Sequence, residues 1–156
     1  MADENTGDLK VNNPFAVEPA WLEKVKEDIV DPDRVIIDTH HHLWEPGGLI
    51  EYSLEDLWAD TGSGHKVEKT VFMECGACYH EDGPEHLRSL GEVEYVTAIA
   101  ERTAKDTSGN AEIAAMVTTF DLRHDDVEGL VQRHEETSKG RFRGIRQALA
   151  SAKPNE

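Results

Sequence analysis

Arg34-Val-Ile-Ile-Asp-Thr-His40 is the stretch that decides the fold, because β-branched residues dominate it and no helical period runs through it. Such a run is typical of a buried strand in a parallel sheet. Three further apolar segments follow along the chain, over residues 67–75, 113–120 and 142–149. The sequence therefore predicts four strands.

Helical patterns separate these strands. Ser53-Leu-Glu-Asp56 is typical of a capping box with Asp in place of Glu, and it predicts a short helix through Trp58. Further helices are expected over about residues 91–105, from Asp125 to Gly140, and from Pro19 to just before Asp31. Alternating strands and amphipathic helices predict the α/β class, with parallel strands and right-handed crossovers. Functional side chains gather where the strands of such sheets end.

Composition excludes several functions for this chain of 156 residues. Its 16 Lys and Arg against 32 Asp and Glu give a net charge of −16, whereas nucleic acids and anionic membranes attract basic patches. No stretch approaches the roughly 20 apolar residues of a membrane-spanning helix. The acidic start, MADENTGDLK, resembles neither a secretory signal nor a transit peptide, and two cysteines exclude a disulfide scaffold. We expect a cytoplasmic protein that binds neither nucleic acid nor membrane.

A run of histidines ends the first predicted strand. Because side chains alternate along a strand, His40 and His42 are expected to point the same way and His41 the opposite way. Two imidazoles so placed can converge on one metal ion. Asp38 has the same parity and is either a group that orients a ligand or a buried polar residue. The alternative is a polar strand end without a ligand.

Several segments resemble the amidohydrolase-related family (amidohydrolase 2), in the branch that includes sugar lactonases and 2-pyrone-4,6-dicarboxylate lactonase. The first is Val35-Ile-Ile-Asp-Thr-His-His-His-Leu-Trp-Glu-Pro46, which looks like the first-strand signature of the family. The others are Thr70-Val-Phe-Met-Glu-Cys75, Gly83-Pro-Glu-His86 with Gly91-Glu-Val-Glu-Tyr-Val96, and Gly140-Arg-Phe-Arg-Gly-Ile-Arg-Gln147. The resemblance covers about residues 31–149.

The resemblance implies a (β/α)8 TIM-barrel hydrolase that acts on a lactone, amide or similar C–O or C–N bond, although some relatives are decarboxylases. His40 and His42 match metal ligands, for zinc or manganese, or histidines that polarise the substrate where no metal is used. A complete barrel runs to about 250 residues, so residues 32–156 match only the first four or so β/α units, after an arm and leading helix over 1–31. The family's later histidine ligand and its general base are expected beyond residue 156, and the catalytic residue is therefore unknown.

Three side chains are candidates for binding the substrate, which the resemblance implies is a small, anionic molecule. Strand alternation places positions 142, 144 and 146 on one face, so Arg146 is expected to point into the barrel, where its planar fork suits a carboxylate. The alternative for Arg146 is an ion pair with a nearby carboxylate. Glu74 lines the pocket or is solvated, and Trp44 forms a pocket wall or packs in the core. A homo-oligomer is possible through unpaired strand edges.

Other functions stay open at this point. Cys75-Gly-Ala-Cys78 is compatible with a redox motif, with a zinc site shared with His40 and His42, or with two reduced thiols at a strand end. The His-x-His pair also fits another metallohydrolase, such as a phosphoesterase or a DNase, the latter disfavoured by the acidic charge. A further alternative is that the chain is a half-barrel without catalytic activity.

Overall fold

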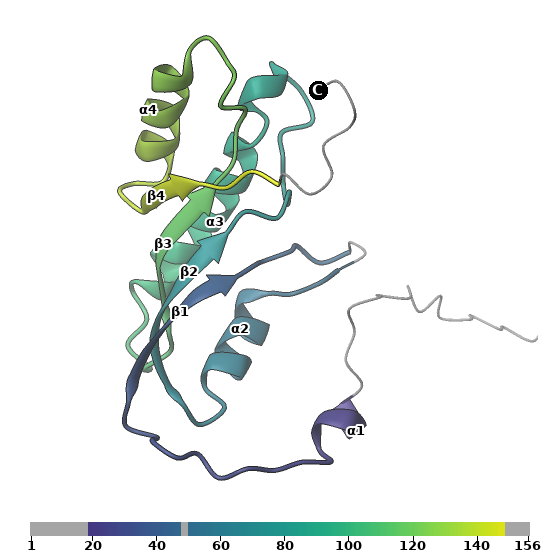
Figure 1. Ribbon diagram of the computed structural model, residues 1–156, viewed down its shortest axis with the longest axis vertical. Coiled ribbons are helices and arrows are strands. Elements are labelled where there is room, and N and C mark those ends of the chain that lie inside the picture. The colour runs from purple at the N-terminus through teal and green to yellow at the C-terminus, as the bar shows by residue number, and fades with distance from the viewer. Residues whose placement is uncertain (1–18, 48–49, 149–156) are drawn as a thin grey trace, which may run out of the picture.

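The computed structural model describes residues 19–47 and 50–148. Its centre is one sheet of four parallel strands that neighbour one another in chain order (Figure 1). The strands are β1 (Val35–His41), β2 (Lys66–Met73), β3 (Glu112–Thr118) and β4 (Phe142–Ile145). The predicted α/β class with a parallel sheet is confirmed, as a partial β/α repeat.

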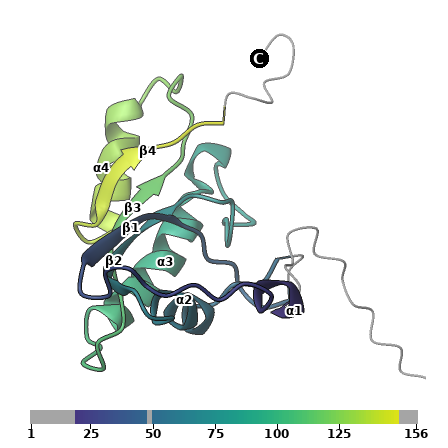
Figure 2. The same cartoon turned by 60° about the horizontal axis from the view of Figure 1, so that its bottom comes forward.

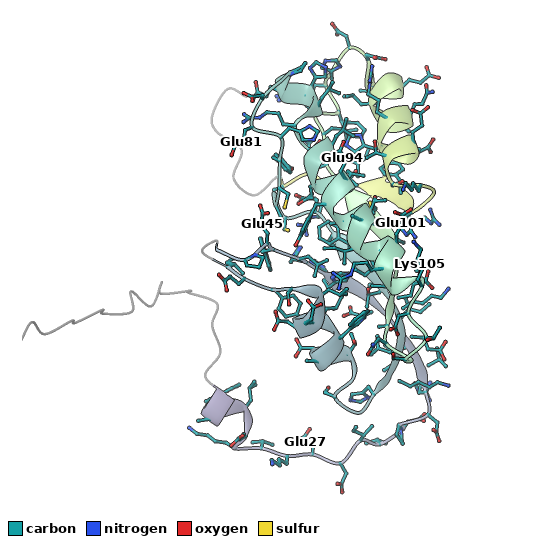
Figure 3. The ribbon with its side chains drawn as sticks, turned by 180° about the vertical axis from the view of Figure 1, so that it is seen from behind. Glu27, Glu45, Glu81, Glu94, Glu101 and Lys105 are labelled. Carbon is teal, nitrogen blue, oxygen red and sulfur yellow. The ribbon has the colours of Figure 1, made fainter. Side chains whose placement is uncertain are left out.

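One short helix precedes β1, and the other helices lie between consecutive strands. They are α1 (Pro19–Leu22), α2 (Leu54–Thr61), the 3-10 turn η1 (Glu85–Leu87), α3 (Leu90–Thr103) and α4 (Val127–Thr137). Figures 1–3 show α2, α3 and α4 on one side of the sheet. Within the described residues, none of these helices has the length and apolar character needed to cross a membrane.

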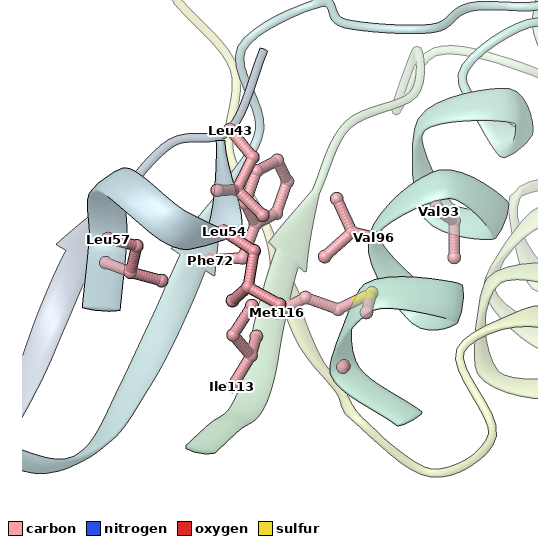
Figure 4. Packing of buried hydrophobic residues seen from close by; sticks show 9 residues of the cluster. Leu43, Leu54, Leu57, Phe72, Val93, Val96, Ile113 and Met116 are labelled. Carbon is pink, nitrogen blue, oxygen red and sulfur yellow. The ribbon is translucent and has the colours of Figure 1, made fainter. Parts of the chain in front are cut away.

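The core lies between the sheet and the helices. Phe72 of β2 and Met116 of β3 are almost fully buried there and meet side chains from α2 and α3 (Figure 4). The whole cluster consists of Leu43, Leu54, Leu57, Phe72, Val93, Val96, Ala100, Ile113 and Met116. This packing leaves the opposite face of the sheet, here called the open face, without a described helix.

The open face exposes apolar side chains of β1. Val35 is 51% exposed and Ile37 is 56% exposed, although both belong to the β-branched run that predicts a buried strand. Ile37 pairs with Lys69 of β2 on this face. The expected burial of β1 is therefore wrong for the part that points away from the helices.

The helical predictions differ in outcome. Ser53 and Asp56 form the predicted capping box, in which each side chain accepts a backbone N–H of the other residue. The leading helix was expected to approach Asp31, but α1 ends at Leu22. Trp21 and Val25 are 63% and 69% exposed, so this part of the apolar stripe packs against none of the described residues, whereas Ile29 is half-buried beside Gly64. The predicted arm up to residue 18 and the end of the fourth strand at Leu149 lie outside the described residues.

Each pair of neighbouring strands contains a register shift. Asp38 pairs with Thr70 and His41 pairs with Phe72, so three steps along β1 match two along β2. A similar shift lies between Phe142 and Gly144 of β4. Simple alternation of side chains is therefore interrupted at these points.

Candidate functional site

Two imidazoles meet at the carboxyl end of β1. The Nε2 atoms of His40 and His42 lie 3.2 Å apart, and the rings stand edge to face with centroids 5.0 Å apart. His40 is exposed and His42 is half-buried. The structure thus brings together the two histidines that strand alternation pairs.

A backbone carbonyl orients His42. Its Nδ1 lies 2.8 Å from the carbonyl oxygen of Met73 at the end of β2. Because a carbonyl oxygen only accepts, this Nδ1 carries the hydrogen, and the neutral ring then presents a lone pair at Nε2. A hydrogen bond from the second ring nitrogen to a carbonyl is the usual arrangement for histidines that bind metals.

The distance between the two Nε2 atoms is informative. Two nitrogen ligands bound at about 2.0–2.1 Å by one tetrahedral zinc ion lie roughly 3.3 Å apart, close to the 3.2 Å found here. Without an ion, the same separation suits a hydrogen bond in which His40 Nε2–H donates to the lone pair of His42. The donor set therefore fits a divalent metal through two of its ligands.

His41 lies apart from this pair. It is only 7% exposed, its Nε2 is 3.0 Å from Thr70 Oγ1, and its ring packs against Phe72. Burial lowers the pKa of His41 to about 4, so the ring is neutral at neutral pH. His41 is thus part of the packing beneath the helices, on the side opposite to the pair, as alternation predicts.

Asp38 does not share the side of the pair, contrary to the expected parity. Its register partner is Thr70, which like Phe72 is buried beneath the helices. The register shift between Asp38 and His41 is the reason. The carboxylate of Asp38 accepts the backbone N–H of His40 at 3.0 Å and so acts on the strand end rather than on an imidazole.

Arg146 and Glu74 form an ion pair. Arg146 Nε donates to Glu74 Oε1 at 2.8 Å and Nη2 donates to the Glu74 carbonyl at 2.6 Å. The Glu74 side chain is 15% exposed and that of Arg146 is 37% exposed. The structure therefore shows the ion pair that was the alternative to substrate binding, and it joins two of the three candidate substrate residues.

Trp44 stands beside the imidazole pair. Its ring centroid is 5.2 Å from that of His42, and its backbone N–H donates to the Tyr52 carbonyl at 3.0 Å. Tyr52 in turn donates its hydroxyl to Asp60 of α2 at 2.5 Å. A cavity of about 390 Å³ lies at the edge between β1 and α2, so its lining includes residues of the helical side as well as the pair: Asp38, His40, His41, His42, Trp44, Tyr52, Leu57, Asp60, Thr61 and Val67.

The two cysteines are protonated thiols. Burial raises the pKa of Cys75 to about 12, and burial together with Glu45 raises that of Cys78 to about 12. Cys75 Sγ–H donates to the carbonyl of Leu43 at 3.4 Å. Since the thiolate is the reactive form, this environment favours the reading of two reduced thiols over a redox motif.

Glu92 is the residue that the sequence reasoning missed. It lies in the first turn of α3, is 1% exposed, and its Oε1 accepts the backbone N–H groups of Cys75 at 3.0 Å and Ala77 at 2.9 Å. Burial raises its pKa. The pattern Ser89-Leu-Gly-Glu92 was a usable signal, although it predicts a helix cap, whereas Glu92 binds the preceding loop instead.

A second cavity, of about 600 Å³, opens beyond the ends of β3 and β4. His86 and His124 stack at its wall with ring centroids 4.4 Å apart, and Phe120 and Gln147 also line it. His124 Nδ1 accepts the backbone N–H of Asp126 at 3.1 Å. That bond fixes the tautomer with hydrogen on Nε2, so this pair is not arranged like His40 and His42.

Among residues 19–47 and 50–148, no group of three or more His, Cys, Asp or Glu side chains is placed to hold a metal ion. The imidazole pair therefore offers two nitrogen donors, with no third among the described residues. Comparison with family models, with curated proteins and with solved structures gave no match for this chain.

Proposed function

We propose that the chain contributes half of the site of a metal-dependent hydrolase of the amidohydrolase type, which acts on a lactone, amide or similar bond of a small anionic molecule. The observation that carries the proposal is the 3.2 Å separation of the His40 and His42 Nε2 atoms. The resemblance of residues 31–149 to that family supports the reaction class. A cytoplasmic location fits this chemistry.

His40 and His42 would hold the ion, zinc or manganese, with His42 fixed by the Met73 carbonyl. A bound divalent metal supplies Lewis acidity toward a carbonyl oxygen and lowers the pKa of a coordinated water. The chain itself provides orientation of the two rings, an aromatic wall at Trp44 and a cation at Arg146.

Arg146 has capacity left for an anionic group. Its Nε and Nη2 are used by Glu74, while its Nη1 has no hydrogen-bond partner among the described residues. Glu74 holds the guanidinium at the end of β2, one residue after the carbonyl that orients His42. A substrate carboxylate bound there would lie on the same strand end as the imidazole pair.

Metal titration tests the proposal. Calorimetry with Zn²⁺, and Co²⁺ absorption as a second readout, should show one weak site in the unmodified chain. His40→Ala and His42→Ala should each weaken binding about tenfold or more, because one of two ligands is lost. His65→Ala is the matched control, since His65 is exposed and precedes β2 at the opposite end of the sheet.

Equal affinity in the two ligand variants and the control would overturn the metal site and leave the pair as a hydrogen bond. Because the chain alone is not expected to turn over a substrate, the reaction class is tested by binding: a carboxylate product of lactone hydrolysis should bind the metal-loaded chain more tightly than a phosphomonoester, and the reverse order would favour a phosphoesterase. This comparison is needed because Arg146 and a bound metal would each suit either a carboxylate or a phosphate.

A further inference from the structure

Five consecutive residues, Met73–Ala77, connect the parts of the candidate site. The Met73 carbonyl accepts from His42, and both the carbonyl and the side chain of Glu74 accept from Arg146. Glu74 N–H also donates to Val117 of β3 at 2.9 Å. The segment 73–77, here called the hub, therefore sets where the imidazole and the guanidinium lie.

The hub is also tied to β1 through its cysteine. Cys75 Sγ–H donates to the carbonyl of Leu43, the residue directly after His42. His42 is thus held on both sides, by its ring at Met73 and by the next carbonyl at Cys75. A displacement of the hub would move His42 relative to His40, which belongs to β1 itself.

A single buried carboxylate anchors the hub to the helical layer. Glu92 Oε1 accepts two backbone N–H groups of the hub, those of Cys75 and Ala77. Its Oε2 is buried and has no hydrogen-bond partner among the described residues. A buried carboxylate oxygen without a partner is energetically unfavourable. The two backbone hydrogen bonds that Oε1 accepts offset this cost and account for a glutamate at this position.

Gly91, the residue before Glu92, shows how closely the loop that contains Cys78 and His80 approaches α3. A Cβ atom at Gly91 would collide with the carbonyl oxygen of Cys78 and would lie 2.8 Å from the backbone nitrogen of His80. Glycine at position 91 thus lets the loop after the hub lie directly on the start of α3. Gly91 and Glu92 together fit this helix to the loop.

We propose that Glu92 is the positioning residue of the candidate site: by fixing the hub it orients His42 and Arg146. The inference rests on the proposed function for its meaning, since the groups that it positions are the proposed metal ligand and anion-binding side chain. Glu92 itself touches neither a metal nor a substrate.

Three variants of the full chain test the role of Glu92. Glu92→Leu removes the acceptor and should lower Zn²⁺ affinity about tenfold or more, the usual effect of losing an outer support of a metal ligand. Glu92→Gln keeps an oxygen that can accept both N–H groups and should restore binding. Glu101→Leu is the control, because Glu101 also belongs to α3 but pairs with Lys139 rather than with the hub, and this variant should bind metal like the unmodified chain.

Two readouts do not need metal. Imidazole nitrogen NMR should show His42 protonated at Nδ1 in the unmodified chain and in Glu92→Gln, and a mixture of tautomers in Glu92→Leu. Alkylation of Cys75, measured in a Cys78→Ser background, should become faster in Glu92→Leu because the thiol leaves the Leu43 carbonyl. Glu92→Asp, one methylene shorter, replaces Glu92→Leu if the latter does not fold and should shift both readouts in the same direction.

The outcomes separate the two proposals. If the unmodified chain binds no metal but Glu92→Leu still changes the His42 tautomer and Cys75 reactivity, the metal site fails and the positioning role stands. If the unmodified chain binds metal and Glu92→Leu binds it equally, with His42 and Cys75 unchanged, the positioning role is overturned.

Discussion

Burial lowers the pKa of two histidines, His41 and His134, for the same physical reason. Both rings lie beneath the helices, with His134 fully buried between Phe120 and the Ser89 hydroxyl. Each is neutral when folded, because a charged imidazole would lose its hydration there. Unfolding exposes both rings and returns them to their ordinary pKa near 6.5.

These shifts predict a loss of stability in acid. Below about pH 6.5 the unfolded chain binds more protons than the folded chain, so the free energy of unfolding falls as the pH decreases. For His41 the loss extends from about pH 6.5 to about pH 4 and amounts to about 3 kcal/mol. Urea denaturation at pH 7 and pH 5 should show a smaller loss in His134→Gln than in the unmodified chain, whereas the exposed-site variant His65→Gln should retain the full loss. An equal loss in His134→Gln would contradict a neutral buried ring.

The Arg146–Glu74 ion pair is a second place where single side chains contribute to the stability of the fold. Lysine cannot reach both Glu74 Oε1 and the Glu74 carbonyl as the guanidinium does. Because Arg146 is partly exposed, Arg146→Lys should lower the free energy of unfolding by only about 0.5–1 kcal/mol. Urea denaturation measures this, and Arg133→Lys on the exposed side of α4 should be neutral. If Arg146→Lys is also neutral, the pair contributes nothing measurable to folding.

A helix or strand could be predicted from the sequence where the interactions that form it lie within a few residues of one another. β-Branched runs and the Ser53 capping box act within a few residues, so the strands and the start of α2 were predictable. The Arg146–Glu74 pair joins residues 72 positions apart. Whether Arg146 pairs with Glu74 depends on how the ends of β2 and β4 are placed on either side of β3. The register shift at Asp38 depends on pairing with β2. The brevity of α1 depends on the tertiary packing of its apolar side chains, which are exposed among the described residues, and no local pattern shows this.

The capping box of α2 gives a direct test at this scale. Ser53 Oγ accepts the backbone N–H of Asp56 at 3.2 Å, and α2 buries Leu54 and Leu57 in the core. Ser53→Ala leaves that N–H without its cap and should lower the free energy of unfolding by about 1 kcal/mol. Thermal or urea denaturation provides the value. Ser63→Ala, at an exposed position after the helix, should change stability little, and an equal effect in both variants would contradict a specific cap.

For the whole molecule, two properties act in opposite directions on association. The sheet has strand edges at β1 and β4 that no other described strand pairs, and its open face exposes Val35 and Ile37. Both features favour contact with another chain. The net charge of −16 opposes contact between copies, and Glu81 and Glu94 are exposed carboxylates on the helical side (Figure 3). Salt weakens this repulsion, since the Debye length falls to about 3 Å at 1 M.

The same geometry predicts that the 156-residue chain alone is not a competent catalyst. Catalytic zinc sites use about three protein ligands, whereas the described residues bring only His40 and His42 together. Within the described residues no hydrogen bond joins a carboxylate to either imidazole, and an unclosed sheet leaves the candidate site open to water. We therefore expect no turnover in an esterase and lactonase screen of the purified, metal-loaded chain. Light scattering should show dimers or larger assemblies that increase with salt. Turnover by a monomer that His40→Ala abolishes would show instead that four β/α units suffice for the chemistry.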